Sequence, residues 1–230
     1  MARRLPQHRI KDLLVAATDV FIAQGYRLTQ MADIAARLGV AKGTLYLYVE
    51  SKEALFDAVL RNAGGLIPDP DALELPIPSP KPGQLRKLVR ARLAATAVPP
   101  ALERALCRRR VSDVRSELEE IVRELFAISL ANRTAVKLID RCPEHPELDG
   151  LFYREGREAQ LDPLERYLEA RIRRGHLRSV PDVAAAARFI VESVATWAVH
   201  VHWDPAPQAL DARAVEETLV HFLLSGLLPS

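Results

Sequence analysis

Apolar residues recur at helical spacing through most of the chain, and the most telling pattern lies between positions 29 and 52. Apolar side chains stand there at i, i+3, i+4 and i+7, namely at Met31, Ile34, Ala35 and Leu38. Gly39 follows, at a point where helices commonly end in a left-handed residue. A second short helix over 41–48 then directs Leu45 and Val49 to the same core. The pattern predicts two short helices joined by a tight turn, a helix-turn-helix.

Two further helices flank this stretch. A stripe of apolar residues predicts a helix over 10–24 that ends at Gly25 and packs across the helix-turn-helix. Ser51 is a good N-cap for a helix over 51–62, which is followed by two glycines. Residues 1–64 therefore form a predicted domain around a three-helix core, with the second short helix free to enter a DNA major groove.

The composition then changes. Six prolines fall between Pro68 and Pro82. Proline lacks the backbone donor and restricts the residue before it, so neither a helix nor a central strand can continue through this segment. We expect 65–84 to be a linker that forms a semi-rigid surface loop, and the alternative is a Pro-rich motif that binds a partner.

The remaining pattern is helical, and no period-two run is long enough for a strand. The expected helices are 85–98, 101–110, 113–141, 151–174, 182–203 and 211–228. Pro163 predicts a kink in the fourth of these. The fold class is therefore all-α, with the N-terminal helix-turn-helix domain followed by a larger helical bundle over 85–230.

Charge and composition narrow the function. The chain carries a net charge of only +2, but residues 1–64 hold nine Lys or Arg against six Asp or Glu, a net +3, which leaves −1 for the remainder. The positive bias thus coincides with the helix-turn-helix, as a phosphate-binding surface requires. Residues 1–9 form a basic arm, which is either a disordered tail or a segment that contacts the minor groove or phosphates.

Other classes of protein are disfavoured. Cys107 and Cys142 are too few for a disulfide framework or a zinc site, and they fit a reducing, cytoplasmic location. The most apolar window, 183–203, is interrupted by charged residues, so we expect neither a membrane span nor a signal peptide. The chain lacks a phosphate-binding Gly-rich loop, a nucleophile elbow and metal-ligand spacing. We therefore expect that the protein is not an enzyme and that it has no catalytic residue, metal site or cofactor.

The helix-turn-helix stretch resembles one family closely. The matching positions are Gly25, Tyr26, Thr29, Ile34, Ala35, Gly39, Val40, Gly43, Thr44, Leu45, Tyr46, Tyr48 and Lys52. The stretch looks like the DNA-binding domain of TetR-family transcriptional repressors, although Val49 stands where most members carry Phe. The resemblance covers about a quarter of the chain.

Site residues follow from the resemblance and from the pattern. The resemblance implies phosphate contacts by Thr29, Thr44, Tyr46 and Lys52, and we expect the Thr29 hydroxyl to cap the first short helix. The candidates for reading base edges are Lys42, Gly43 and Leu47, with Tyr48 on the same exposed side. Because Leu45 and Val49 already occupy inward positions, at least one of the two tyrosines should be exposed.

The resemblance also implies roles for the bundle. In the family this part binds a ligand and forms the dimer, so the helices 182–203 and 211–228 are expected to pair with those of a second copy, with intrachain packing as the alternative. A small-molecule effector bound in this part would then release the protein from a palindromic operator. The alternative function is that of a ligand-independent DNA-binding regulator or architectural factor. Candidates to line the ligand pocket, which are alternatively plain core, are Phe126, Arg133, Tyr153, Tyr167, Trp197 and His200.

Overall fold

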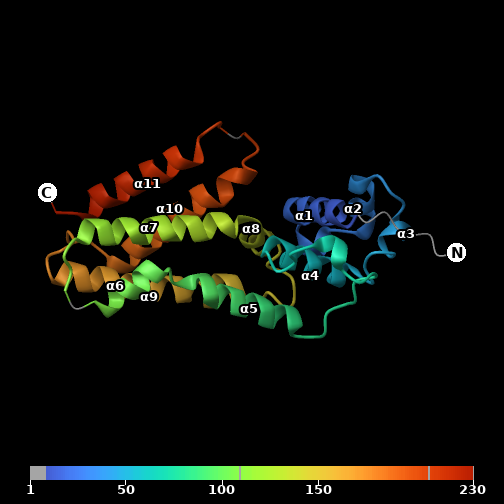
Figure 1. The fold of residues 1–230 in the computed structure, drawn as a ribbon, viewed down its shortest axis with the longest axis horizontal. Coiled ribbons are helices and arrows are strands. Elements are labelled where there is room, and N and C mark those ends of the chain that lie inside the picture. Colours follow the sequence, from blue (N-terminus) through green and yellow to red (C-terminus); the bar gives the residue numbers. More distant parts are fainter. Residues whose placement is uncertain (1–8, 109, 207, 230) are drawn as a thin grey trace. The chain divides into compact units, whose positions relative to one another are not determined.

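The computed structural model describes residues 9–108, 110–206 and 208–229, and within these ranges the fold is all-α, as predicted (Figure 1). The N-terminal helices are α1 Arg9–Leu28, α2 Met31–Leu38, α3 Lys42–Leu45 and α4 Lys52–Ala63. The later helices are α5 Gln84–Ala97, α6 Pro100–Cys107, α7 Val114–Ala131, α8 Arg133–Arg141, α9 Arg157–Arg173, α10 Val183–Ala198 and α11 Ala212–Leu227. Short 3₁₀ turns cover Pro70–Ala72 and His200–Trp203, and a π-helical turn covers Leu151–Gly156. Most of the basic arm lies outside the described residues.

The chain divides into two compact units. The first comprises residues up to 89 together with 134–151, and the second comprises 90–133 and 152–230. This division differs from the expected one at 64 and 85. The Pro-rich segment belongs to the first unit, and a stretch from the middle of the chain, which includes most of α8, joins it there.

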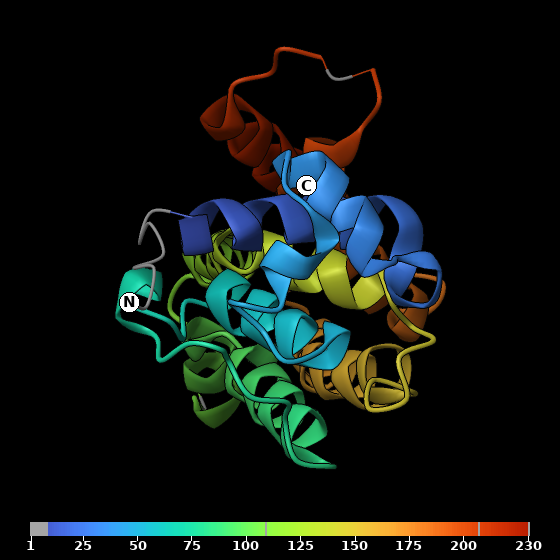
Figure 2. The ribbon, with the colours of Figure 1, turned by 90° about the vertical axis from the view of Figure 1, so that its right-hand side faces the viewer.

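The first unit is built around α1, which packs against both α2 and α4 (Figure 2). Three aromatic rings form the centre of this core. The ring of Phe56 lies 5.0 Å from that of Phe21 and 5.0 Å from that of Tyr26. Gly25 breaks the regular helix with a φ of 77°, in the left-handed region, so the stop predicted at this residue is confirmed although hydrogen-bonded turns continue to Leu28.

Several predicted helices are divided or shortened. The expected helix 41–48 is helical only over α3, because residues 46–48 form a turn. The expected helix 113–141 is broken at Asn132, whose side-chain amide donates to the Ile128 carbonyl. The helix expected over 182–203 changes to a 3₁₀ turn after Ala198. Pro163 lies inside α9, and the kink predicted there stays a prediction.

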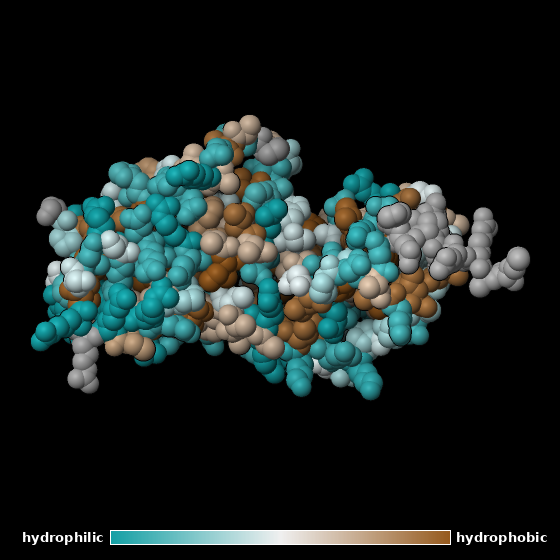
Figure 3. Space-filling model, in the orientation of Figure 1, coloured by the Kyte–Doolittle hydropathy of each residue, from teal (hydrophilic) through white to brown (hydrophobic). Residues whose placement is uncertain are grey.

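The second unit is a bundle in which α10 packs against α7 and α9, and α11 packs against α7. A buried ion pair joins two of its helices: Arg171 of α9 donates to Glu117 of α7 at 2.7 Å and also to the Ala105 carbonyl at 2.7 Å. The surface that Figure 3 presents is predominantly hydrophilic. Among the described residues, no helix has an apolar stretch of the length that crossing a bilayer requires.

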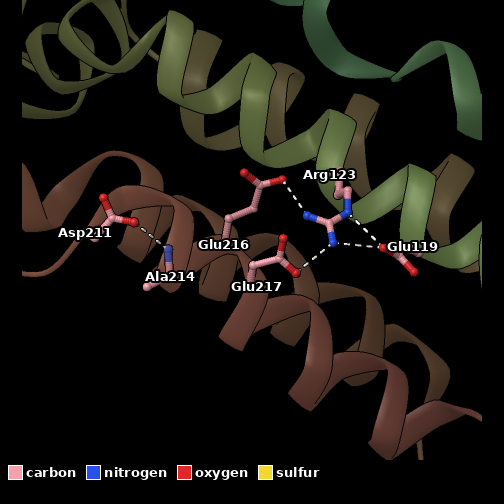
Figure 4. Close-up of polar contacts among 6 residues, drawn as sticks. All are labelled: Glu119, Arg123, Asp211, Ala214, Glu216 and Glu217. Carbon is pink, nitrogen blue, oxygen red and sulfur yellow. Dashed lines mark hydrogen bonds and ion pairs between the residues drawn. The ribbon is translucent and has the colours of Figure 1, made fainter.

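A second polar junction ties α11 to α7 at the surface (Figure 4). The guanidinium of Arg123 donates to Glu119 on its own helix and to Glu216 and Glu217 on α11, at distances of 2.8 to 3.1 Å. These carboxylates raise the pKa of Arg123 through hydrogen bonds, so the side chain keeps its charge. The junction fixes the first half of α11 against α7.

Candidate nucleic-acid interface

The turn between α2 and α3 has the geometry that the sequence predicts. Gly39 adopts φ 71° and ψ 34°, and its N–H donates to carbonyls in the last turn of α2. The N–H of Val40 donates to the Ala35 carbonyl at 3.0 Å. These bonds satisfy the free carbonyls at the end of α2 and fix the direction in which α3 leaves. At the other end, Ser51 caps α4 by accepting a hydrogen bond from the Ala54 N–H at 3.0 Å, as predicted.

The outer side of α3 presents a compact exposed surface. Lys42 and Gly43 are exposed, and a Cβ atom built on Gly43 would meet nothing within 4 Å. Leu47 is 51% exposed and Tyr46 is 44% exposed, while Thr44 is half-buried. The inner side carries Leu45 and Val49, which are completely buried. One short segment therefore holds a cation, an open backbone and two large side chains on a single accessible side.

Tyr48 departs from the prediction. Its side chain is only 1% exposed, so the expectation that it lies on the same side as Leu47 is wrong. The cause is the end of α3 at Leu45: the N–H groups of Tyr48 and Val49 both donate to the Leu45 carbonyl, and this turn directs the tyrosine inward. The more general expectation, that at least one tyrosine is exposed, is met by Tyr46.

Thr29 also departs from the prediction. Its hydroxyl donates to the Gly25 carbonyl at 2.7 Å, and the residue is 1% exposed. The N-cap of α2 is Gln30, whose N–H donates to the Asp33 carboxylate at 2.8 Å. The Thr29 side chain therefore closes the end of α1, and it has no access to a phosphate.

Lys52 has an internal role that the sequence did not indicate. Its ammonium group donates to the carbonyls of Tyr26 and Thr29, both at 3.0 Å, and lies 4.4 Å from the centre of the Tyr26 ring. A cation is favourable at this place because free carbonyls and the negative end of the helix dipole converge there. Of the four residues expected to bind phosphate, Thr29 is buried, Thr44 and Lys52 are half-buried, and Tyr46 is 44% exposed.

Residues 141–145, from the middle of the chain, pack against the helices of the first unit. The imidazole of His145 lies 4.3 Å from the Tyr26 ring and 4.9 Å from the Phe56 ring. Burial lowers the pKa of His145. The Glu144 carboxylate accepts the Arg27 N–H at 3.0 Å, and a Cβ on Gly25 would lie 3.0 Å from this carboxylate. The glycine is thus required by the close approach of residues 141–145, an interaction that the sequence did not indicate.

The six candidate pocket residues differ widely in their surroundings. Phe126 and Tyr167 are buried, whereas Tyr153 and Trp197 are 43% and 38% exposed. Arg133 is exposed and donates to the Leu130 carbonyl, and His200 is half-buried. None of the six lines the open surface cavity of about 560 Å³ on the second unit, which is lined by Ser116, Glu119, Glu120, Arg123, Glu124, Ala127 and Glu216. No candidate metal cluster occurs in the part of the chain that the structure describes.

The last two helices carry large apolar side chains on their outer surfaces. Phe189 and Trp197 of α10 are 67% and 38% exposed, and Phe222 of α11 is 70% exposed. Small residues, among them Ala214 and Gly226, are also exposed on α11. Exposed aromatic groups of this size on neighbouring helices are typical of a surface that another protein covers.

Known proteins resemble both parts of the chain. Residues 13–59 match the model of the bacterial regulatory proteins of the tetR family, and residues 116–225 match that of the C-terminal domain of AefR-like transcriptional repressors.

Individual relatives extend this picture. The chain is 26% identical over 225 residues to the HTH-type transcriptional repressor KstR2 of Rhodococcus jostii, which covers 95% of this chain and 91% of that protein. A stretch of 59 residues is 46% identical to the HTH-type transcriptional activator FasR of Mycolicibacterium smegmatis, and this match spans only 27% of the relative's length. The structure of the ketosteroid transcriptional regulator KstR2 of Mycobacterium tuberculosis has the same fold, with a TM-score of 0.57 at 20% identity over 96% of each chain.

Proposed function

Because the chain belongs to the TetR family of DNA-binding transcriptional regulators, we propose that it is a repressor that binds a near-palindromic operator as a homodimer and is released by a small molecule. The observation that carries this proposal is the exposed side of α3. Lys42 and Gly43 lie there on α3, Leu47 lies on the turn that follows it, and Leu45 fixes the inner side of the helix in the core. Such a constellation on a rigid element suits base reading in a major groove.

Within this proposal the exposed residues divide into two groups. Lys42 donates to guanine O6 and N7, Gly43 lets the backbone approach the bases, and Leu47 makes apolar contacts with a thymine methyl group. The hydroxyl groups of Thr44 and Tyr46 donate hydrogen bonds to phosphate oxygens, and these contacts fix the register of α3 along the groove. Operator DNA lies in the cytoplasm, which is where we expect the protein to act.

The exposed aromatic side chains of α10 and α11 support the dimer. Phe189, Trp197 and Phe222 would be buried between two copies in an isologous interface, where aromatic residues are commonly the main contributors to affinity. Two copies present two α3 helices, so the operator has two inverted half-sites at a spacing set by the dimer.

Segment 134–151 supports ligand-dependent release. It belongs to the DNA-binding unit, while both flanks of the chain, 90–133 and 152–230, belong to the unit that would hold the ligand. A rearrangement of the second unit would act on His145 and Glu144, which contact α1 and α4. The ligand releases DNA to the extent that it prefers a state unsuited to the operator. The repressive sense rests on the similarity to the repressor KstR2 of Rhodococcus jostii over nearly the whole chain.

The experiment begins with selection of binding sites from a random-sequence DNA pool by the wild-type protein. The expected product is an inverted repeat bound by a dimer, as measured by mobility shift and sedimentation. Small molecules are then added to the complex, and transcription from a promoter with the selected site is measured. Selection of no site would refute the operator, a monomer on one half-site would refute the dimer, and failure of every compound to release DNA would favour the ligand-independent regulator.

A further inference from the structure

The helix α3, which is proposed to read bases, is here called the recognition helix. The Pro-rich segment after α4 is hydrogen-bonded to the residues that connect the recognition helix to α4, which its expected role as a linker does not explain. In the run of residues 76–80, here called the strap, every second residue is proline and has no backbone N–H. The strap therefore has two backbone donors, at Ile77 and Ser79. The Ile77 N–H donates to the Tyr48 carbonyl at 2.8 Å. The Ser79 N–H donates to the Glu50 carboxylate at 2.9 Å.

The strap makes further hydrogen bonds to the residues that connect α3 to α4. The Glu50 N–H donates to the Ile77 carbonyl at 3.0 Å, which completes a parallel bridge between Val49 and Ile77. The hydroxyl groups of Ser79 and Ser51 lie 2.8 Å apart. Because Ser51 is the N-cap of α4, the strap is bonded both to the turn that follows α3 and to the start of α4.

Both flanks of the strap are anchored within the first unit. On the N-terminal side, Asp71 forms an ion pair with Lys11 of α1 at 2.8 Å. On the C-terminal side, the Glu147 carboxylate accepts the Gly83 N–H at 2.6 Å and the Arg86 N–H at 3.0 Å. The alternating prolines favour an extended, stiff backbone between these anchors. The strap is thus a braced element, unlike a freely moving loop.

The recognition helix needs such support because it is short. With four helical residues, α3 has little stability of its own and takes its position from tertiary contacts. Leu45 and Val49 hold its inner side. The turn that follows leaves backbone groups at Tyr48 and Glu50 that the strap satisfies. Removal of the strap would leave those groups to water and let α3 shift relative to α4.

We infer that the strap is a positioning element for DNA recognition, and that Ile77 and Ser79 are positioning residues that set how α3 meets the base edges. This inference rests on the proposed role of α3. Base contacts require atomic placement, whereas contacts to phosphates tolerate displacement. Loss of a strap bond should therefore weaken binding to the selected site more than binding to unrelated DNA.

The test compares Ile77→Pro and Ser79→Pro, which remove one backbone donor each, with Ile77→Val and Ser79→Thr, which keep the backbone N–H and, at position 79, also the hydroxyl group that lies 2.8 Å from that of Ser51. The probe is a duplex carrying the site that the wild-type protein selects, beside a duplex of unrelated sequence. Each proline variant should lose about threefold to tenfold in affinity for the selected site, as one hydrogen bond predicts. The matched variants should stay within about twofold, and affinity for unrelated DNA should change less. All affinities are measured well below the unfolding temperature of each variant, so that every variant is folded. If the strap only stabilised the fold, the affinities would then be unchanged.

Amide hydrogen exchange of the wild-type protein gives a second test that does not depend on the variants folding. If the strap and DNA binding are coupled, the selected duplex should slow exchange at the Ile77 and Ser79 amides, because linkage is reciprocal. Equal exchange with and without the duplex would overturn the inference, as would proline variants that bind the selected site as wild type does. A wild-type protein that selects no site would instead refute the proposed function.

Discussion

The ammonium group of Lys52 lies 3.0 Å from the carbonyl oxygen of Thr29 and ties the start of α4 to the end of α1. The same group donates to the Tyr26 carbonyl and lies over the Tyr26 ring. A lysine that the family pattern associates with phosphate thus closes the junction between two helices of the DNA-binding unit. Its position in the sequence is that of a DNA contact, and its hydrogen bonds are those of a structural residue.

Lys52→Ala is expected to destabilise the first unit. The substitution leaves two carbonyls without their donor, at a cost of about 1–3 kcal/mol in the free energy of unfolding. Urea denaturation followed by tyrosine fluorescence measures this loss, with Lys87→Ala on the exposed side of α5 as a matched control of equal charge. Unchanged stability together with a salt slope lower by about one would restore Lys52 to the phosphate contacts.

Lys42→Ala is expected to change base preference while leaving the stability of the protein unaltered. Lys42 is exposed on α3, and a lost contact to a guanine edge costs about 1–3 kcal/mol at one position of the site. Site selection with the variant should show relaxed preference at that base pair and at its symmetry mate. An identical selected sequence for variant and wild type would show that Lys42 does not read bases.

Phe222→Glu is expected to weaken the homodimer. A charge placed at the centre of an aromatic interface would be buried without a partner, so the dimer dissociation constant should rise about tenfold or more. Sedimentation velocity over a concentration series measures it. Val15→Glu replaces a comparably exposed apolar residue on α1, 61% against 70%, and should leave association unaffected. If both variants dimerise as wild type does, α11 does not form the interface.

His145 predicts a dependence of stability on pH. Burial holds its pKa below the usual value of about 6.5, so the unfolded chain binds a proton at this residue before the folded chain does. The stability is therefore fully present above about pH 6.5 and decreases as the pH falls toward the pKa of the folded state. Phe fits the aromatic surroundings provided by Tyr26 and Phe56, so His145→Phe should flatten the profile. Thermal unfolding across about pH 5–8 measures the effect, and equal slopes for variant and wild type would contradict it.

Local patterns determined the all-α fold, the helix-turn-helix and its family. Helical periodicity, the left-handed Gly39 and the Ser51 cap depend on neighbouring residues, so they are readable from the sequence and hold in the structure. Lys42, Gly43 and Leu47, the candidates for reading bases, are exposed in the structure, whereas Tyr48, expected on the same side, is buried. Each of these features is decided within a few residues of chain.

Only the tertiary structure decided what depends on partners distant in sequence. Lys52 and Thr29 turned inward because free carbonyls at the end of α1 lie beside them, and Tyr48 did so because α3 ends early. The docking of His145 against Tyr26 joins residues more than a hundred positions apart. The prolines of the strap predict the absence of regular structure there. The sequence did not show that its two remaining donors would reach the Tyr48 carbonyl and the Glu50 carboxylate. Hydrogen bonds and close packing across such separations are set by the fold as a whole, whereas periodicity reports only which side of a helix is buried.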